Sequence, residues 1–461
     1  MMYRWLGLVV VTAGCFRPDS AAVPCSDGWC PAPLTCVAEV CQAATDAEAG
    51  PDARAIGCGA GDVLLLEGGG QRPCPLGCTT TPDPHCLELA PSNGLDPALL
   101  AGTGTLIIDG DTLIDTSTGT LSGAVSRAGF GVDTTFAFEV SGPPGEEVAV
   151  LRASTLIIER GTIIVEGSIP LVLLARELQV GAEAIVDVSA RCSGPGVDRT
   201  CPGPGGGTGA GGDPLAGERA TGCGPGDSAE LGSRSGGGGG GHGGGGGRGG
   251  RGNAGPSTPG GLTCAGSELE PLRGGSGGGG STLLGPTDGR GQGGGGGGAI
   301  QLTALEQLSI AGRIRSHGRG GAGGGLAGIG GGGGGGGGAG GGVLLEAITC
   351  DLAGAYVAAN GGGGGGGTQE AATSSQPGAD GSDTPEPAKG GDGAAPGGDG
   401  GAGGAGTSPG GADGAATTGG ALAAGGGGGG GAGVIVTRCH TSSGAPTLTS
   451  PAPIVVPVRT R

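Results

Sequence analysis

Aromatic residues are scarce in this chain and make up 2% of its 461 residues. Large rings therefore cannot dominate a core, which must be built from Leu, Ile, Val and Ala. Lysine is nearly absent, since Lys389 is the only one. With a net charge of −18, the chain repels phosphate backbones, so nucleic acid is not an expected partner. The local arginines Arg313, Arg315 and Arg319 are expected to keep a loop solvated.

Long apolar runs are missing too. The stretch 5–11 is far shorter than the roughly 20 residues that a membrane-spanning helix needs. It follows Arg4 and is closed by the small residues of Thr12-Ala13-Gly14-Cys15, which is the order of an export signal. We therefore expect a lipid on Cys15, with an ordinary secretory signal as the alternative.

The cysteines support export independently. The chain has 15, and setting Cys15 aside leaves an even number, which permits complete pairing. Disulfides persist in an oxidising compartment such as the periplasm or the cell surface. The expected disulfide cysteines are Cys25, Cys30, Cys36, Cys41, Cys58, Cys74, Cys78, Cys86, Cys192, Cys201, Cys223, Cys264, Cys350 and Cys439. Their connectivity stays open, and a zinc site of Cys74, Cys78, His85 and Cys86 is an alternative use of one cluster.

Short runs of β-branched residues indicate strands rather than helices. They occur at 106–108, 156–158, 163–165, 171–174, 185–186, 300–304, 343–347 and 434–436. Turn signals such as Glu159-Arg160-Gly161 separate them. The units that start at Pro170, Ile300 and Val343 each add a second partial strand, and such units must stack to bury their apolar faces. This favours a β-solenoid over a sandwich.

The chain also contains 125 glycines and 32 prolines, about a third of its residues, a fraction that normally signals low complexity. Glycine runs lie at 236–241, 243–247, 293–298, 330–338, 361–367 and 425–431. They are flexible coils or extended helices with three residues per turn, which can pack closely because they lack Cβ atoms. The segment 368–424, rich in Asp, Ser, Thr and Pro, is expected to be mobile.

Together these patterns predict a mainly β fold. We expect β-solenoid (parallel β-helix-like) units interleaved with polyglycine-II-type or disordered glycine-rich excursions, preceded by small disulfide-rich modules. The expected regions are a lipoprotein signal peptide (1–14), a lipid tether with a small cysteine module and linker (15–57), a second cysteine module (58–95), a β-rich solenoid-like domain (96–191), a glycine-rich region with embedded strands (192–433) and a last strand with the C-terminal tail (434–461).

No catalytic pattern stands out. The histidines, His85, His242, His317 and His440, are in no metal-binding helix motif. Polyglycine matches dinucleotide-binding motifs trivially, and no serine nucleophile elbow is present. Asp109-Gly110-Asp111 and the region of Asp392 and Asp399 are weak candidates for calcium, since neither has the regular nonapeptide repeat of calcium-binding β-rolls. The chain is therefore not expected to be an enzyme or to need a cofactor.

The signal at Cys15, the segment from Cys74 to Cys86 with its Pro91-Ser92-Asn93-Gly94 exit, and the strand-plus-polyglycine body resemble uncharacterised glycine-rich surface lipoproteins of Gram-negative bacteria. The polyglycine part also resembles the glycine-helix bundles of springtail antifreeze proteins and certain phage tail-fibre tips. These resemblances imply an architecture and carry over no functional residue.

The function expected from the sequence is that of a non-enzymatic structural or adhesive lipoprotein of the bacterial cell envelope. It is expected at the outer membrane, facing the periplasm or the surface, or else secreted. Its expected partners are the membrane, through the lipid, and surface glycans or other envelope components. The alternatives are a carbohydrate-binding or polysaccharide-cleaving β-helix protein and an ice- or mineral-facing polyglycine surface.

Overall fold

The structure is a computed structural model, and its chain divides into two compact units, Met1–Leu87 and Glu88–Arg461. Three short strands are described by their backbone alone between residues 23 and 43. The other described residues are 54–100, 103–192, 198–211, 219–253, 255–281, 291–327, 330–369, 375–420 and 422–461. Cys15, Cys25 and Cys30 lie outside them.

The first unit contains small antiparallel sheets whose strands are two to five residues long. Its strands are β1 (Val23–Pro24), β2 (Leu34–Val37), β3 (Val40–Ala43), β4 (Ala55–Gly59), β5 (Val63–Leu66), β6 (Gln71–Pro73), β7 (Cys78–Thr79) and β8 (His85–Cys86). Cys36 and Cys41 face each other in the pairing of β2 with β3. Sheets this small bury little apolar surface, so the unit depends on cross-links.

The second unit is dominated by one large sheet, which is mainly parallel and confirms the expected mainly β class. Its strands are β9 (Thr105–Asp109), β10 (Thr112–Asp115), β11 (Thr120–Gly123), β12 (Gly131–Val132), β13 (Ala137–Ser141), β14 (Val148–Arg152), β15 (Thr155–Glu166), β16 (Leu171–Asp187), β17 (Ala299–Ile310), β18 (Arg313–Arg315), β21 (Gly342–Asp351), β22 (Tyr356–Ala358), β23 (Val434–Ser443), β24 (Leu448–Ser450) and β25 (Ile454–Val455). A 3₁₀ helix, η1 (Pro97–Leu100), and a short hairpin, β19 (Leu326–Ala327) with β20 (Gly330–Gly331), complete it.

The long strands pair in parallel over three successive stretches separated by shifts of register. In β16, residues 171–175 pair with the start of β17, residues 177–180 with its end, and residues 185–187 with β18. The same order recurs where β17 pairs with β21 and β18 with β22. It recurs again where β21 pairs with β23 and β22 with β24. Each stretch thus stacks on its counterpart from the next passage of the chain.

Both faces of the first stretch are apolar and buried, as expected of parallel strands covered on both sides. Leu171 and Leu173 point into the main core, which gathers inward side chains from all three stretches. Val172 and Leu174 point the other way, into a second cluster. That cluster is closed by residues from outside the sheet, namely Leu95, Leu100, Leu269 and Leu272.

The turn expected at Glu159-Arg160-Gly161 does not form, because β15 runs through it. The register shifts between Ile158 and Arg160 instead, which bends the strand without reversing it. Gly161 has a φ of +89°, and a Cβ there would lie 2.4 Å from the carbonyl carbon of Gly110. A single glycine therefore produces a bend where the sequence suggests a turn.

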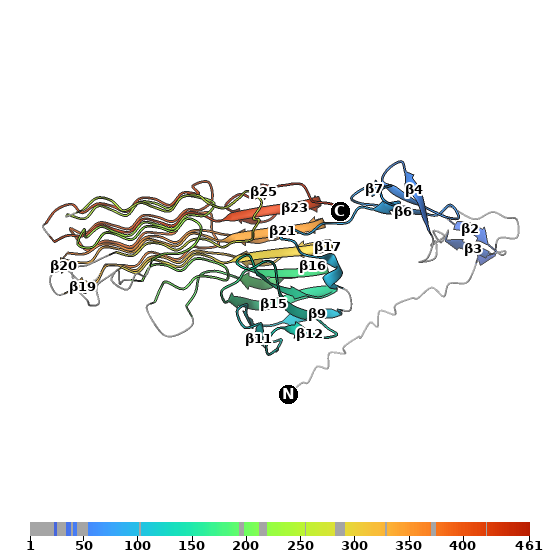
Figure 1. Ribbon diagram of the computed structural model, residues 1–461, viewed down its shortest axis with the longest axis horizontal. Coiled ribbons are helices and arrows are strands. Elements are labelled where there is room, and N and C mark those ends of the chain that lie inside the picture. The colour runs from blue at the N-terminus through green and yellow to red at the C-terminus, as the bar shows by residue number, and fades with distance from the viewer. Residues whose placement is uncertain are drawn as a thin grey trace, which may run out of the picture. The chain divides into compact units, whose positions relative to one another are not determined.

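Between the stacked strands, the chain leaves the sheet in long glycine-rich excursions. They extend from one end of the strands as nearly straight, parallel rods, drawn in green to red in Figure 1. Their hydrogen bonds repeat every third residue. Gly425, Gly428 and Gly431 donate to the carbonyls of Arg234, Gly237 and Gly240 at 2.9–3.0 Å. This is the periodicity of an extended helix with three residues per turn.

The rod at residues 424–433 is surrounded by six others. Its amides donate to segments 234–240, 409–415 and 359–368, and its carbonyls accept from segments 244–250, 334–340 and 398–404. A buried backbone amide without a partner is costly, and here neighbouring rods supply every partner. The rods therefore form an ordered lattice rather than flexible coils.

The expectation that 368–424 is mobile is wrong for its described residues, 368–369, 375–420 and 422–424, which contain rods of this lattice. Within 368–424, Gly391 donates to Gly364 at 2.8 Å and Gly401 to Gly427 at 2.8 Å. Its composition misleads because polar residues are accommodated at exposed positions while backbone groups beside them bond to other rods. Asp392 and Asp413, for example, are exposed, while the amides of Gly391 and Gly414 donate to the carbonyls of Gly364 and Arg248.

Candidate functional site

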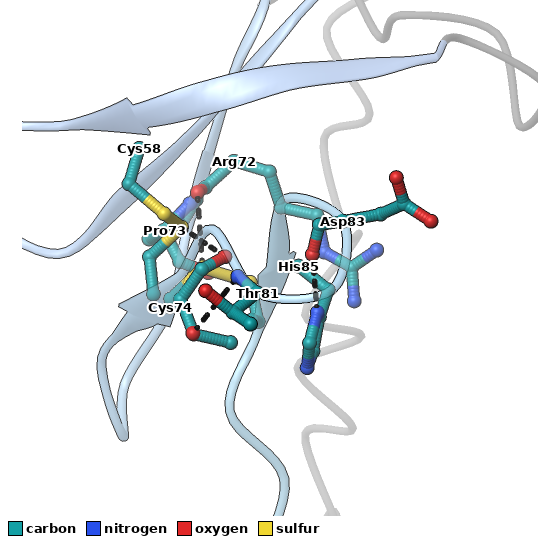
Figure 2. Close-up of a disulfide and its surroundings, with 10 residues drawn as sticks. Cys58, Arg72, Pro73, Cys74, Thr81, Asp83 and His85 are labelled. Carbon is teal, nitrogen blue, oxygen red and sulfur yellow. Dashed lines mark hydrogen bonds between the residues drawn. A yellow bond between two sulfur atoms is a disulfide. The ribbon is translucent and has the colours of Figure 1, made fainter.

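The cysteine cluster of the first unit is a pair of disulfides (Figure 2). Cys58 bonds to Cys78 and Cys74 to Cys86, with Cα separations of 5.8 and 5.0 Å. Zinc needs thiolates, which these sulfurs no longer offer. His85 Nδ1 lies 2.7 Å from the carbonyl oxygen of Asp83 rather than near a sulfur. The zinc alternative at this cluster is therefore wrong.

Disulfides also join dispersed cysteines of the second unit. They link Cys192 to Cys201, Cys223 to Cys264, and Cys350 to Cys439. Asp198 lies close to the first of these pairs, but both sulfurs are again bound to each other and cannot ligate a metal. Of the carboxylates considered for calcium, Asp109 pairs with Arg160, and Asp111 accepts from the amide of Thr162 at 2.8 Å. Asp399 accepts from the amide of Gly393.

A row of buried polar residues crosses the face of the sheet that carries the second cluster. Thr303, Glu346 and Arg438 lie on neighbouring strands β17, β21 and β23 in one register, and each is nine-tenths or more buried. Glu346 accepts from the amide and hydroxyl of Ser92 at 3.0 and 2.8 Å and from the hydroxyl of Thr303 at 3.1 Å. Burial raises the pKa of Glu346, and the bonds from Ser92 offset part of that rise.

Arg438 anchors the other end of the row. Its side chain is 1% exposed, and its Nη2 lies 2.9 Å from Glu268 and 3.1 Å from Glu270. Arg459 binds the same two carboxylates. A buried guanidinium without these partners would be strongly destabilising. The row thus fixes segments 92–93, 268–270 and 459 to the sheet.

A second charged cluster lies where the sheet gives way to the rods. Asp383 accepts from Arg313 at 2.9 Å, from Arg315 at 2.5–3.0 Å and from Nε2 of His317 at 3.1 Å. Burial opposes ionisation of Asp383, but the bonds from His317 and Arg315 outweigh it and hold its pKa below the usual range. These arginines therefore fasten a segment to the sheet instead of solvating a loop.

His317 and Asp383 are the residue types of a general-base dyad, but neither ring nitrogen of His317 is free to accept a proton from a substrate. The amide of Asn360 donates to Nδ1 of His317 at 3.3 Å, so the ring proton lies on Nε2 and points to Asp383. The hydroxyl of Ser189 accepts from the His317 amide. A base must reach the proton that it abstracts, and both ring nitrogens are already engaged.

Beside this cluster is a cleft of about 520 Å³. The charged residues that line it are Asp187, Arg191, Arg315, Arg319, Asp380 and Asp383, with His317. They come from the end of β16, from β18 and from two rod segments, which the tertiary structure brings together. A hollow of this size suits a small molecule or one group of a larger one.

His242 interrupts a glycine run and is fully buried. Neither ring nitrogen makes a hydrogen bond of normal geometry. Burial lowers its pKa to about 4, and the nearby backbone groups of Gly341, Arg273 and Gly340 offset only part of this effect. The imidazole is therefore neutral at pH 7 and acts as a packing residue at the base of the rods.

No family model, curated protein or solved structure matches this chain. Its site must therefore be interpreted from its own geometry. In the part of the chain that the structure describes, no helix has the length and apolarity needed to cross a bilayer.

Sequence reasoning missed the row at Glu346 and Arg438, because its members are more than 40 residues apart from one another and meet only through strand register. The charged cluster around Asp383, in contrast, left a detectable signal in the sequence. Arg313, Arg315 and His317 alternate, which places their side chains on one face of an extended segment.

Proposed function

We propose that this chain is a non-enzymatic structural or adhesive protein of the bacterial envelope. A lipid on Cys15 tethers it to a membrane, and the glycine rods form its rigid, projecting part. The observation that carries the proposal is the rod at 424–433, whose backbone binds six neighbouring segments. Such bonding turns a glycine-rich sequence, ordinarily a flexible tether, into a stiff body.

The rods are proposed to be polyglycine-II-type helices, which have three residues per turn and no internal hydrogen bonds. The period-three donor pattern supports this assignment. The close approach of backbones supports it as well, since a Cβ on Gly337 would lie 2.1 Å from the carbonyl oxygen of Gly362. Only glycine permits such packing, which explains the length of the uninterrupted runs.

The strands are proposed to form a β-solenoid with three faces. The three paired stretches of β16, repeated at β17, β21 and β23, support this reading. Each excursion then starts and ends at the same corner of the solenoid. Rods from successive turns would leave the corner side by side, in position to bond to one another.

The polar row suits a tethered body. Ser92 lies just after the start of the second unit, and it binds the buried Glu346 through both its amide and its hydroxyl. Tension on the N-terminal side would therefore reach the sheet through several buried bonds. This gives a lipid-anchored chain a mechanically sound point of attachment.

The experiment is a Cys15→Ala variant of the full chain, followed through membrane fractionation and an assay of cell-surface adhesion. We expect wild-type protein in the membrane fraction and the variant in the soluble fraction, because the acyl chains supply the membrane affinity. Loss of adhesion should accompany release. A variant that stays fully membrane-bound would refute the tether, and adhesion that survives complete release would refute the surface role.

A further inference from the structure

The cleft between the sheet and the rods carries an excess of positive charge, although the chain as a whole is strongly acidic. Arg191, Arg315 and Arg319 line it directly, and Arg199 and Arg313 contact its acidic residues. The three aspartates that line the cleft are fewer than these five arginines.

Each of those aspartates is already neutralised by the protein. Asp187 accepts from Arg191 at 2.9 Å, and Asp383 is held by two arginines and His317. Asp380 accepts from Arg199 at 3.2 Å and from the amide of Gly320 at 2.8 Å. None of the three is left to balance a further cation.

The arginines, in contrast, keep unused donors. Among the described residues, Arg191 donates only through Nη2 and Arg315 only through Nε and Nη2, in each case to a carboxylate. Arg319 has no carboxylate partner within the described residues, and its Nε and Nη1 make no hydrogen bond. Burial lowers the pKa of the neighbouring Arg199, Asp380 raises it, and the charge of Arg319 lowers it again. Arg319 is thus a poorly compensated charge close to a second cation.

We propose that this cleft binds an oxyanion, with Arg319 supplying the uncompensated charge and Arg191 and Arg315 the free donors. The ligand class is a carboxylate, phosphate or sulfate group, free or carried by a larger envelope component. Guanidinium groups bind such oxygens through charge-assisted hydrogen bonds. Arg191 follows β16, whereas Arg315 and Arg319 lie on one stretch that runs from β18 into a rod, so an anion bound here also ties the rods to the sheet. This site is independent of the proposed tether.

The test is binding of inorganic phosphate, sulfate and acetate to the detergent-solubilised full chain, by calorimetry and thermal unfolding, with chloride at equal ionic strength as reference. We expect saturable binding of at least one oxyanion and a rise in Tm with its concentration. The oxyanion that binds identifies the source chemistry. Arg319→Gln should raise the dissociation constant roughly tenfold or more.

The same variant provides a second readout. Without anion, Arg319→Gln should unfold at a higher temperature than wild type, because a poorly paired, partly buried cation has been removed. The matched control is Arg176→Gln, since Arg176 is 58% exposed, lies outside the cleft and pairs with Glu306. It should bind anions as wild type does. Equal effects of oxyanions and chloride, or unchanged binding by Arg319→Gln, would overturn the proposal.

Discussion

The role of a buried polar residue in this protein depends on whether it finds hydrogen-bond partners. His242 is the clearest case, because it is buried at the base of the rods with no hydrogen bond of normal geometry on either ring nitrogen. Glu346 is buried as deeply, but Ser92 and Thr303 supply donors to it. Equal burial therefore has different consequences. Glu346 joins segments, whereas His242 is tolerated only while neutral.

Acid should destabilise the protein through His242. Its pKa falls from 6.5 to about 4 on folding, so the unfolded chain binds more protons between these values and stability declines as pH drops from 6.5 toward 4. At pH 5 the loss relative to pH 7 is about 2 kcal/mol. Denaturant unfolding at both pH values should show this loss in wild type and a smaller one in His242→Leu.

The matched control is His440→Gln, because His440 is exposed on β23. It should retain the full pH dependence of wild type. Equal pH dependence in His242→Leu and wild type would show that the buried imidazole does not titrate as described.

At the scale of elements, the rods replace side-chain packing with backbone packing. In the lattice, a rod contacts its neighbours through carbonyls and amides, so any inward Cβ collides with backbone. Strands follow the usual rule, in which alternating side chains fill a core. The two kinds of element meet at residues such as Gly341 and Gly433, where the rods give way to β21 and β23.

Position within a rod should determine the cost of adding a methyl group. Gly337→Ala places a Cβ 2.1 Å from the Gly362 carbonyl oxygen, whereas the atom nearest to a Cβ on Gly245 is 3.6 Å away. We expect Gly337→Ala to lower the free energy of unfolding by about 3 kcal/mol and Gly245→Ala to change it by less than about 0.5 kcal/mol. Denaturant unfolding, with hydrogen exchange of the rod amides, measures both. Similar values for the two variants would contradict close backbone packing.

The contribution of each disulfide to the free energy of unfolding should depend on the length of the loop that it closes. Cys350–Cys439 spans 89 residues and includes a whole excursion, while Cys192–Cys201 spans 9. Loop-closure entropy predicts a loss of about 4.5 kcal/mol for the Cys350→Ala/Cys439→Ala variant and about 2.5 kcal/mol for Cys192→Ala/Cys201→Ala. Chemical denaturation under oxidising conditions compares them. A larger loss for the shorter loop would mean that strain or local packing outweighs chain entropy.

At the scale of the whole molecule, the second unit is built from segments that lie far apart in the sequence. The central rod bonds to pieces of chain from residue 234 to residue 415, and the polar row ties residue 92 to residue 346. Such long-range order makes early and late parts of the chain depend on one another. Damage to one rod should therefore weaken the contacts of its neighbours.

The sequence by itself determined the strands, since β-branched runs at 171–174, 300–304 and 343–347 all lie in β16, β17 and β21. It also identified cysteines that pair, because their number and the export pattern left few other uses for them. The glycine runs were ambiguous, because composition describes a free coil and a packed rod equally well.

Only the tertiary structure decided that ambiguity. A glycine rod is ordered when neighbours accept its amide protons, and these neighbours lie up to about 190 residues away in sequence. The same holds for the arginine cleft and the Glu346 row, whose members share no local pattern that spans them. Local sequence preferences determined where the strands form. Hydrogen bonding between distant segments determined that the glycine rods are ordered and which residues meet in the sites.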